Sequence, residues 1–152
     1  MIPRARGANK QGESWLTYSG VVLGVAGLYL GAMDQQAVFN RVYLHLTAQG
    51  AKSRTGIPGV SDGCAYRGDG GLQCAVGCLI KDEHFDPWWN LEAVCNPFVN
   101  RALEQSLGCV LTDDDHLFLG SLQSVHDNYP VGAWPARLAV FASARSLNIP
   151  EI

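Results

Sequence analysis

The seventeen residues from Cys64 to Ile80 constrain the fold more than any other part of this chain. They hold three of the five cysteines, at positions 64, 74 and 78, around the run Gly68-Asp69-Gly70-Gly71. Glycine reaches positive φ at little steric cost, so this run predicts a chain reversal. Strand-compatible residues flank it, and the residues after Cys74 predict a helical turn with Cys74 and Cys78 on one face. We therefore expect a short β-hairpin that carries a cysteine cluster.

Three interpretations of the cysteine cluster follow. The favoured one is that the thiols are small, buried, apolar side chains, which is the usual environment of a free cysteine. The second is a zinc site, since zinc binds four nitrogen or sulfur ligands. Its ligands would be Cys64, Cys74 and Cys78, with Cys95 or alternatively His84 as the fourth. The paired C-x2-C spacing of common zinc sites is absent. We expect no cofactor, with zinc as the alternative.

The third interpretation is a cysteine nucleophile. A thiol at a helix N-terminus has a lowered pKa, and Cys74 or Cys78 would act with His126 as base and Asp127 as the group that orients it. His116 is the alternative base, and Asp115 is the alternative orienting group. The sequence has no phosphate loop, dinucleotide fingerprint or H-E-x-x-H motif. No catalytic residue is therefore favoured, and the sequence leaves open whether this protein is an enzyme.

The cysteine segment and its flanks together resemble a group of small phage and prophage proteins that have no assigned activity. The residues that carry the resemblance are Thr47-Ala48-Gln49-Gly50, Cys64-Ala65-Tyr66-Arg67-Gly68, Cys74 to Ile80, Asp82-Glu83, Asp86-Pro87 and Leu122-Gln123-Ser124-Val125-His126-Asp127. The resemblance covers roughly residues 34–148. It implies a phage-type origin and a cytoplasmic site of action, and it assigns no catalytic residue.

Charge is distributed unevenly along the chain. Residues 1–32 carry three basic and one acidic side chain, a net charge of +2, and the remainder carries 8 basic and 13 acidic side chains, a net charge of −5. An acidic domain is a poor binder of nucleic acid phosphate and suits a basic protein partner. We therefore expect a host or phage protein as the partner, with inhibition of a host enzyme or immune complex as the use, and we do not expect nucleic acid.

The first 33 residues form a separate segment before a single globular domain of residues 34–152. Residues 15–33 are nineteen residues without charge, long enough to span a bilayer and to anchor the protein in an inner membrane. Two alternatives remain: a strand pair over 16–23 and 25–30 that turns at Gly24, or an extension created by the choice of start site. The phage group supports the extension, because its members begin near Asp34.

Helix start and stop signals divide the rest of the chain. Asp34 is an N-cap for a helix that ends before Gly50, and Asn96-Pro97 starts a helix that ends before Gly108. Thr112 and Asp115 form a capping box for the next helix, whose buried face we assign to Leu117, Leu122 and Val125. A last helix spans about 132–147. The predicted fold class is a mainly helical α+β domain, with about four helices around the cysteine hairpin.

The connector Asp82 to Trp89 is acidic and ends in two adjacent tryptophans. Trp88 and Trp89 follow the rigid Pro87, and tryptophan is enriched among the residues that dominate binding energy at protein interfaces. We predict a partner-binding surface of Asp86, Trp88 and Trp89. Burial of the two rings against the hairpin is the alternative.

Overall fold

The computed structural model describes residues 22–23, 29–56 and 64–152 of the 152-residue chain. Within these ranges no helix is both long and apolar enough to cross a bilayer. The membrane helix and the strand pair considered for the first 33 residues fall largely outside the described positions. The strands that the structure does contain are β1 (Val22–Leu23) and β2 (Tyr29–Leu30), which pair antiparallel with Val22 opposite Leu30.

Four α-helices make up the body of the described domain. They are α1 (Gln35–Gln49), α2 (Pro97–Leu107), α3 (Asp113–Asn128) and α4 (Trp134–Ala144). Short 3₁₀ turns span Asp69–Gly71, Gly77–Leu79, Asp82–His84, Pro87–Trp89 and Val131–Ala133.

The predicted helix caps are confirmed. The Asp34 carboxylate accepts a hydrogen bond from the Ala37 N–H, and Gly50 ends α1 in the left-handed conformation with φ of 58°. Thr112 and Asp115 form the reciprocal capping box at the start of α3. Burial alone would raise the pKa of Asp115, but hydrogen bonds from Thr112 and Gln35 outweigh it and leave that pKa below its ordinary value.

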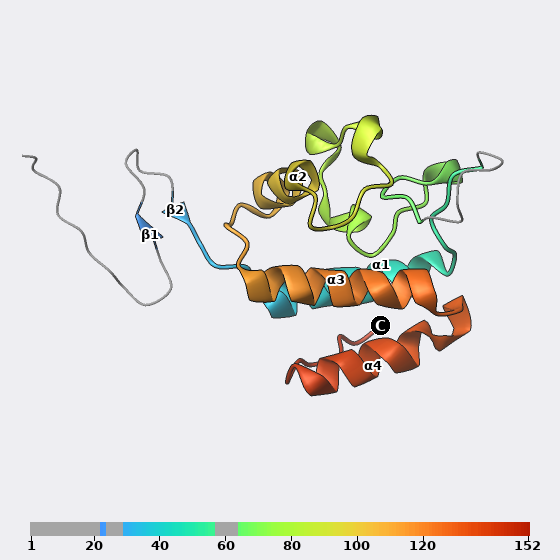
Figure 1. The fold of residues 1–152 in the computed structure, drawn as a ribbon. Coiled ribbons are helices and arrows are strands. Elements are labelled where there is room, and N and C mark those ends of the chain that lie inside the picture. Colours follow the sequence, from blue (N-terminus) through green and yellow to red (C-terminus); the bar gives the residue numbers. More distant parts are fainter. Residues whose placement is uncertain (1–21, 24–28, 57–63) are drawn as a thin grey trace, which may run out of the picture.

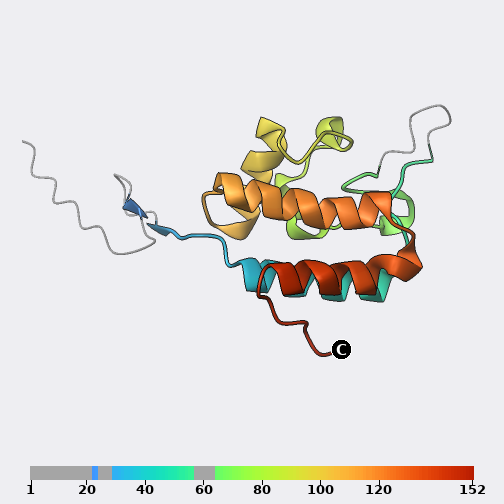
Figure 2. The same ribbon diagram turned by 60° about the horizontal axis from the view of Figure 1, so that its bottom comes forward.

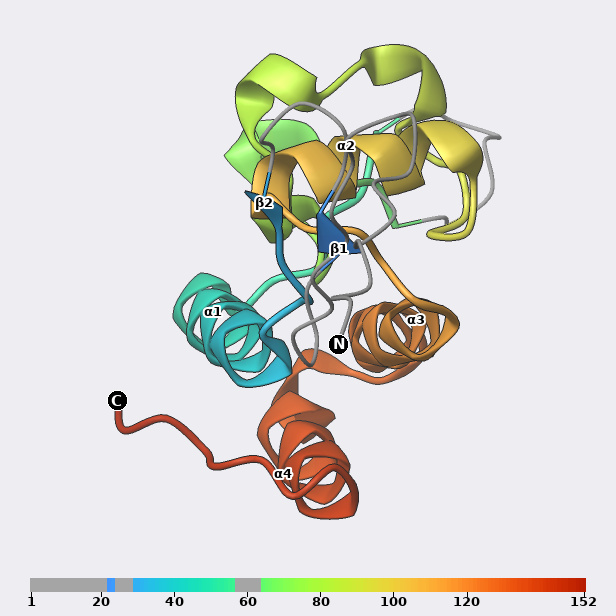
Figure 3. The same cartoon turned by 90° about the vertical axis from the view of Figure 1, so that its left-hand side faces the viewer.

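Helices α1, α3 and α4 form one group, and α2 covers it on one side together with the 3₁₀ turns that precede α2 in the chain. Figure 3 shows the three helices end-on at the corners of a triangle, and Figure 2 shows α3 running along the group. In Figure 1 the yellow-green turns lie beside α2 on the far side of α3 from α4. The contacts of the Gly77–Leu79 turn with α1 and α2 join the two layers.

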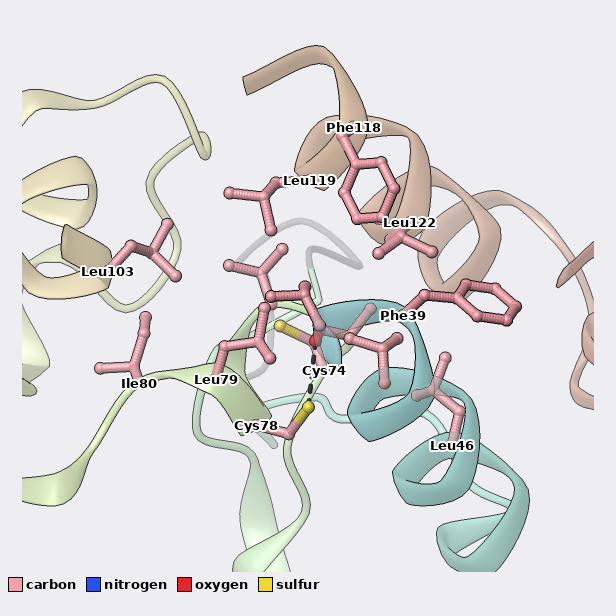
Figure 4. Close-up of a cluster of buried hydrophobic side chains, with 14 of the residues drawn as sticks. Phe39, Leu46, Cys74, Cys78, Leu79, Ile80, Leu103, Phe118, Leu119 and Leu122 are labelled. Carbon is pink, nitrogen blue, oxygen red and sulfur yellow. Dashed lines mark hydrogen bonds between the residues drawn. The ribbon is translucent and has the colours of Figure 1, made fainter. Parts of the chain in front are cut away.

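The core lies where these layers meet. Phe39 of α1 and Phe118 of α3 are fully buried, and both pack against the ring of Phe141, with centroid separations of 6.1 and 5.1 Å. In Figure 4, Leu79 and Ile80 point from the 3₁₀ turn toward Leu103 of α2 and the side chains of α1 and α3. Burial of each large apolar side chain stabilises the fold by about 1.5–3 kcal/mol.

The α+β prediction is wrong, because the cysteine segment contains no β-strand in its described residues. The chain does reverse at Asp69–Gly71, but only one isolated bridge, Arg67 with Gln73, joins the two sides. The backbone groups that would form the first strand of the hairpin are instead hydrogen-bonded to other segments. The N–H of Ala65 donates to Ser53, the N–H of Tyr66 donates to the Asn90 carbonyl, and the Asn90 side chain bonds both backbone groups of Arg67.

Arg67 holds the covering segment together. Its guanidinium donates to the carbonyls of Gly77 and Ile80, at 2.6 and 2.7 Å, and to the Asp82 carboxylate at 2.9 Å. The same group lies 5.1 Å from the centre of the Phe85 ring. One side chain therefore satisfies three acceptors that no strand ladder would reach.

One inward assignment on α3 is also wrong. Leu117 is 67% exposed, whereas Leu122 and Val125 are buried as expected. The inward stripe of α3 includes the polar residues Gln123 and His126, the second of which is fully buried. Polar groups with partners from other segments take positions that an apolar pattern would assign to leucine.

Candidate functional site

The first part of the site is the cysteine turn, which we define as residues 74–80. Cys74 is fully buried, and its sulfur accepts the Gly77 N–H at 3.2 Å. The Cys78 thiol donates to the Ala75 carbonyl at 3.1 Å, the contact dashed in Figure 4. Burial is the main cause that raises the pKa of each of these thiols to about 12. Both thiols are therefore protonated at neutral pH and hydrogen-bonded within their own turn.

The turn is packed against its neighbours through a close backbone contact. A Cβ atom added to Gly77 would lie 2.2 Å from the Tyr66 carbonyl oxygen, a separation that real Cβ atoms do not show. The Val76 N–H donates at 3.0 Å to the Gln123 side chain of α3. These contacts leave the turn no surface for a ligand.

The second part of the site joins Cys64 to α3. The Cys64 sulfur, a ring nitrogen of His126 and a carboxylate oxygen of Asp127 all lie within 4.8 Å of one another. His126 is fully buried and stacks on Trp134 with a centroid separation of 5.2 Å, whereas Cys64 and Asp127 are partly exposed. Burial, followed by the hydrogen bond with the Asp127 carboxylate, raises the pKa of the Cys64 thiol to about 12.

Hydrogen bonds occupy both ring nitrogens of His126. The Ser53 backbone N–H lies 3.1 Å from Nε2, and a backbone N–H can only donate, so Nε2 is the acceptor. The proton of the neutral ring is then on Nδ1, which donates to the Asp127 carboxylate at 2.9 Å. Neither nitrogen is free to take a proton from a thiol or to bind a metal ion in this arrangement.

Gln123 joins the cysteine turn to this second part. Its amide oxygen accepts from Val76, and its amide nitrogen donates to the Asp127 carboxylate at 2.7 Å. Gln123, His126 and Asp127 are three and four residues apart on α3, a spacing that places them on neighbouring positions of one helix face. This spacing could have predicted the whole network from the sequence. The sequence analysis paired His126 with Asp127 but did not include Gln123.

A cleft of about 520 Å³ opens beside this network, and we call it the thiol cleft. Two thiols line it, those of Cys64 and Cys95, together with the carboxylates of Glu92 and Asp127. The rest of its lining is Tyr66, Leu91, Ala93, Val94, His116, Gly120, Gln123, Ser124 and Asn128. Its volume is that of a small-molecule or side-chain pocket.

The predicted zinc ligands are divided between these two environments. Cys74 and Cys78 are bonded within the cysteine turn, whereas Cys64 and exposed Cys95 line the thiol cleft. The predicted catalytic residues are divided in the same way, because His126 and Asp127 lie with Cys64 rather than with a helix-terminal Cys74 or Cys78. The structure therefore replaces both expected sets with one cluster, Cys64, His126 and Asp127.

The aromatic surface is the third part of the site, and we define it as Asp86, Trp88 and Phe98. Trp88 and Phe98 are 57% and 56% exposed, and their rings meet edge to face with centroids 4.5 Å apart. The Asp86 carboxylate accepts the Trp88 N–H at 3.2 Å and caps the Pro87–Trp89 turn. Phe98, in the first turn of α2, was not part of the predicted surface.

Trp89 does not belong to the aromatic surface. It is only 3% exposed, and its ring packs edge to face on Tyr66 and Phe85 at 5.7 and 5.0 Å. The 3₁₀ turn directs two consecutive side chains to different sides. Of the two tryptophans assigned to partner binding, Trp88 alone is available to a partner.

Comparison with known proteins gives no relative of this chain. No protein family, no curated protein and no solved structure matches it significantly.

Proposed function

We propose that this chain is a small phage-type accessory protein that acts in the cytoplasm by binding another protein. The observation that carries the proposal is the exposed ring pair of Trp88 and Phe98. Large aromatic side chains usually lose their exposure in a folded domain, and an exposed pair in mutual contact is the kind of anchor that dominates binding energy at protein interfaces. The phage-type resemblance agrees with this assignment.

The charge around the aromatic surface indicates the kind of partner. Acidic side chains at positions 82, 83, 86 and 92 are all exposed along the segment that leads to it. One of them, Asp82, pairs with Arg67, and the other three have no lysine or arginine as an ion-pair partner among the described residues. Opposite charge speeds encounter and selects among partners, so we assign a basic protein as the partner. Inhibition of a host enzyme or immune complex is the use that we propose for such binding.

The arrangement of the thiols favours binding over cysteine catalysis. A nucleophilic cysteine needs a lowered pKa or a free base beside it. The pKa values of Cys64, Cys74 and Cys78 are all raised to about 12, and the Nε2 atom of His126 is bonded to Ser53. The three thiols therefore stay protonated at neutral pH, and the Nε2 atom of His126 is not free to accept a proton from them.

The test is affinity capture from host lysate with the full chain and with three variants as bait. Trp88→Ala and Phe98→Ala remove the two exposed rings, and Val140→Ala is the matched control because Val140 is 66% exposed on α4. We expect one captured protein to fall by about tenfold or more with each aromatic variant, which is the loss typical of an interface anchor. The control should retain it. Equal capture by all four baits would contradict the proposal.

A further inference from the structure

The thiol cleft has the composition of a site for a cation. Two acidic residues line it, Glu92 from the segment before α2 and Asp127 from α3. The Glu92 carboxylate accepts one hydrogen bond, from the Asn96 amide at 3.3 Å. No lysine or arginine is among the described residues that line it. Leu91, Val94 and Gly120 add apolar wall between the charged groups. A ligand with a positive group on an aliphatic stem would match both kinds of lining.

The Asp127 carboxylate is held in place by neutral donors. Gln123 and His126 both donate to its Oδ1 atom, at 2.7 and 2.9 Å. Among the described residues, no lysine or arginine lies within ion-pairing distance of this carboxylate. The Lys52 ammonium bonds the carbonyl oxygen of Asp127 and not its carboxylate. Neutral donors fix the position of the carboxylate without forming an ion pair with it. The Lys52 ammonium on the carbonyl oxygen of the same residue offsets part of its negative charge.

The chemistry of the two acidic residues favours a guanidinium group. Planar guanidinium presents several N–H donors in a fixed fork and pairs with carboxylates through two parallel hydrogen bonds. An ammonium group is a compact, strongly hydrated point charge that lacks this planar fork. We propose that the thiol cleft binds a guanidinium group between Glu92 and Asp127.

This inference rests on the proposed function where the guanidinium belongs to an arginine of the basic partner. Residues 86–98 contribute both to the aromatic surface and to one wall of the cleft, so one partner could contact both. The same chemistry could also come from a free small guanidine. An arginine side chain and a free guanidine would bind the cleft through the same contacts. The experiment distinguishes them by which probe binds more tightly.

The test is a titration of the full-length protein, followed by the ¹H–¹⁵N shifts of its amides. The probes are Nα-acetyl-arginine amide, agmatine and a short arginine-containing peptide, and Nα-acetyl-citrulline amide is the uncharged control. We expect saturable shifts at residues 91–95 and 120–128 with the guanidinium probes. Tighter binding of the peptide identifies an arginine of a protein as the source, and tighter binding of agmatine identifies a small guanidine.

Charge-removing variants connect the response to the two carboxylates. Glu92→Gln and Asp127→Asn should each weaken binding by about tenfold, the loss expected when a charge-assisted hydrogen bond is removed. Asp113→Asn is the matched control, because Asp113 is exposed at the start of α3 and does not line the cleft. Since Asp127 also bonds His126, Glu92→Gln keeps the test valid if Asp127→Asn fails to fold.

Two results would overturn the cleft inference: no saturable shift at these residues, or equal binding of the citrulline probe. Either result, combined with loss of capture by Trp88→Ala, would leave the protein-binding proposal in place. The opposite pattern, in which the cleft binds guanidinium and the aromatic variants capture normally, would remove the proposed function and keep the guanidinium site.

Discussion

Trp88 and Trp89 are neighbours in the chain, yet Trp88 is 57% exposed and Trp89 is 3% exposed. The same contrast separates the two regions to which they belong. Trp89 packs with Tyr66 beside the cysteine turn, whereas Trp88 belongs to the aromatic surface. In the cysteine turn the thiols and the Val76 amide bond to groups of the protein itself, and the aromatic surface presents its rings to solvent. We therefore expect the first region to contribute more to stability, and we propose that the second is the one that binds a partner.

The sharpest test of this contrast is to truncate each tryptophan separately. Trp89→Ala removes a buried ring with two aromatic contacts and should lower the free energy of unfolding by about 3–5 kcal/mol. Trp88→Ala loses one exposed edge-to-face contact and should cost about 1 kcal/mol or less. Urea unfolding followed by circular dichroism measures both values. Similar losses in the two variants would mean that the regions do not differ as described.

Glycine-to-alanine changes compare the cysteine turn with the wall of the thiol cleft. Gly77→Ala places a methyl group against the Tyr66 backbone, and we expect a loss of about 3 kcal/mol or more, since the contact is with main chain that cannot rotate away. Gly120 of α3 has no atom within 4 Å of an added Cβ. Gly120→Ala should therefore stabilise the protein by about 0.5–1 kcal/mol through helix propensity.

The outcome is read from the urea midpoints of the two variants. A neutral Gly77→Ala change would show that the turn can move away from Tyr66. A destabilising Gly120→Ala change would show that the cleft wall is packed more tightly than the structure indicates. Either result would weaken the distinction between a rigid turn and an accommodating cleft.

These contrasts also show which features could be read from the sequence. The caps at Asp34 and Thr112 are local, because each side chain bonds an amide three residues away, and the sequence predicted both. The hairpin prediction failed because Asn90, more than twenty residues further along the chain, takes backbone groups of Tyr66 and Arg67. A local pattern carries no information about such remote partners.

The candidate site likewise has one part that the sequence could predict and one part that it could not. The i, i+3, i+4 spacing of Gln123, His126 and Asp127 on one helix is visible in the sequence. The approach of Cys64 to Asp127, and of the Ser53 amide to His126, depends on how distant segments pack. The different environments of Trp88 and Trp89 depend on the 3₁₀ geometry of a three-residue turn. A turn of three residues is too short for the spacing of apolar residues to predict which side chain is buried.

The thiols of the cysteine turn predict a dependence of stability on alkaline pH. The pKa values of Cys74 and Cys78 are raised from about 9 to about 12, mainly by burial. A raised folded pKa contributes stability that is complete below the unfolded pKa and is lost as pH rises through the folded one. Between pH 9 and 12 each thiol should therefore reduce the free energy of unfolding by about 1.4 kcal/mol per pH unit.

Chemical denaturation at pH 9, 10 and 11 measures this slope. Other groups also titrate in this range, so the matched control is the double variant Cys74→Ala/Cys78→Ala, whose slope should be smaller by the contribution of the two thiols. A double variant with an unchanged slope would show that these thiols are already ionisable in the folded protein. That result would reopen the catalytic interpretation of Cys74 and Cys78.

The smallest expected effect is that of zinc, which tests whether the Cys64, His126 and Asp127 cluster is a hydrogen-bond network or a metal site. A metal on Nδ1 of His126 would displace the proton shared with Asp127, and a metal on Nε2 would displace the Ser53 amide. We therefore expect that neither EDTA nor added zinc shifts the melting temperature by more than about 1 °C for a domain of this size.

A real zinc site would give a different result that is easy to measure. A ligand at about 100 times its dissociation constant stabilises the folded state by about 2.7 kcal/mol, which corresponds to roughly 5–10 °C for a chain of this length. Thermal melts with zinc, with EDTA and with the Cys64→Ser variant separate the two cases. A zinc-dependent rise that Cys64→Ser abolishes would mean that the Ser53 and Asp127 bonds to His126 yield to the metal. The cluster would then be a metal site, unlike the cysteine turn, whose thiols bond to groups of the protein itself.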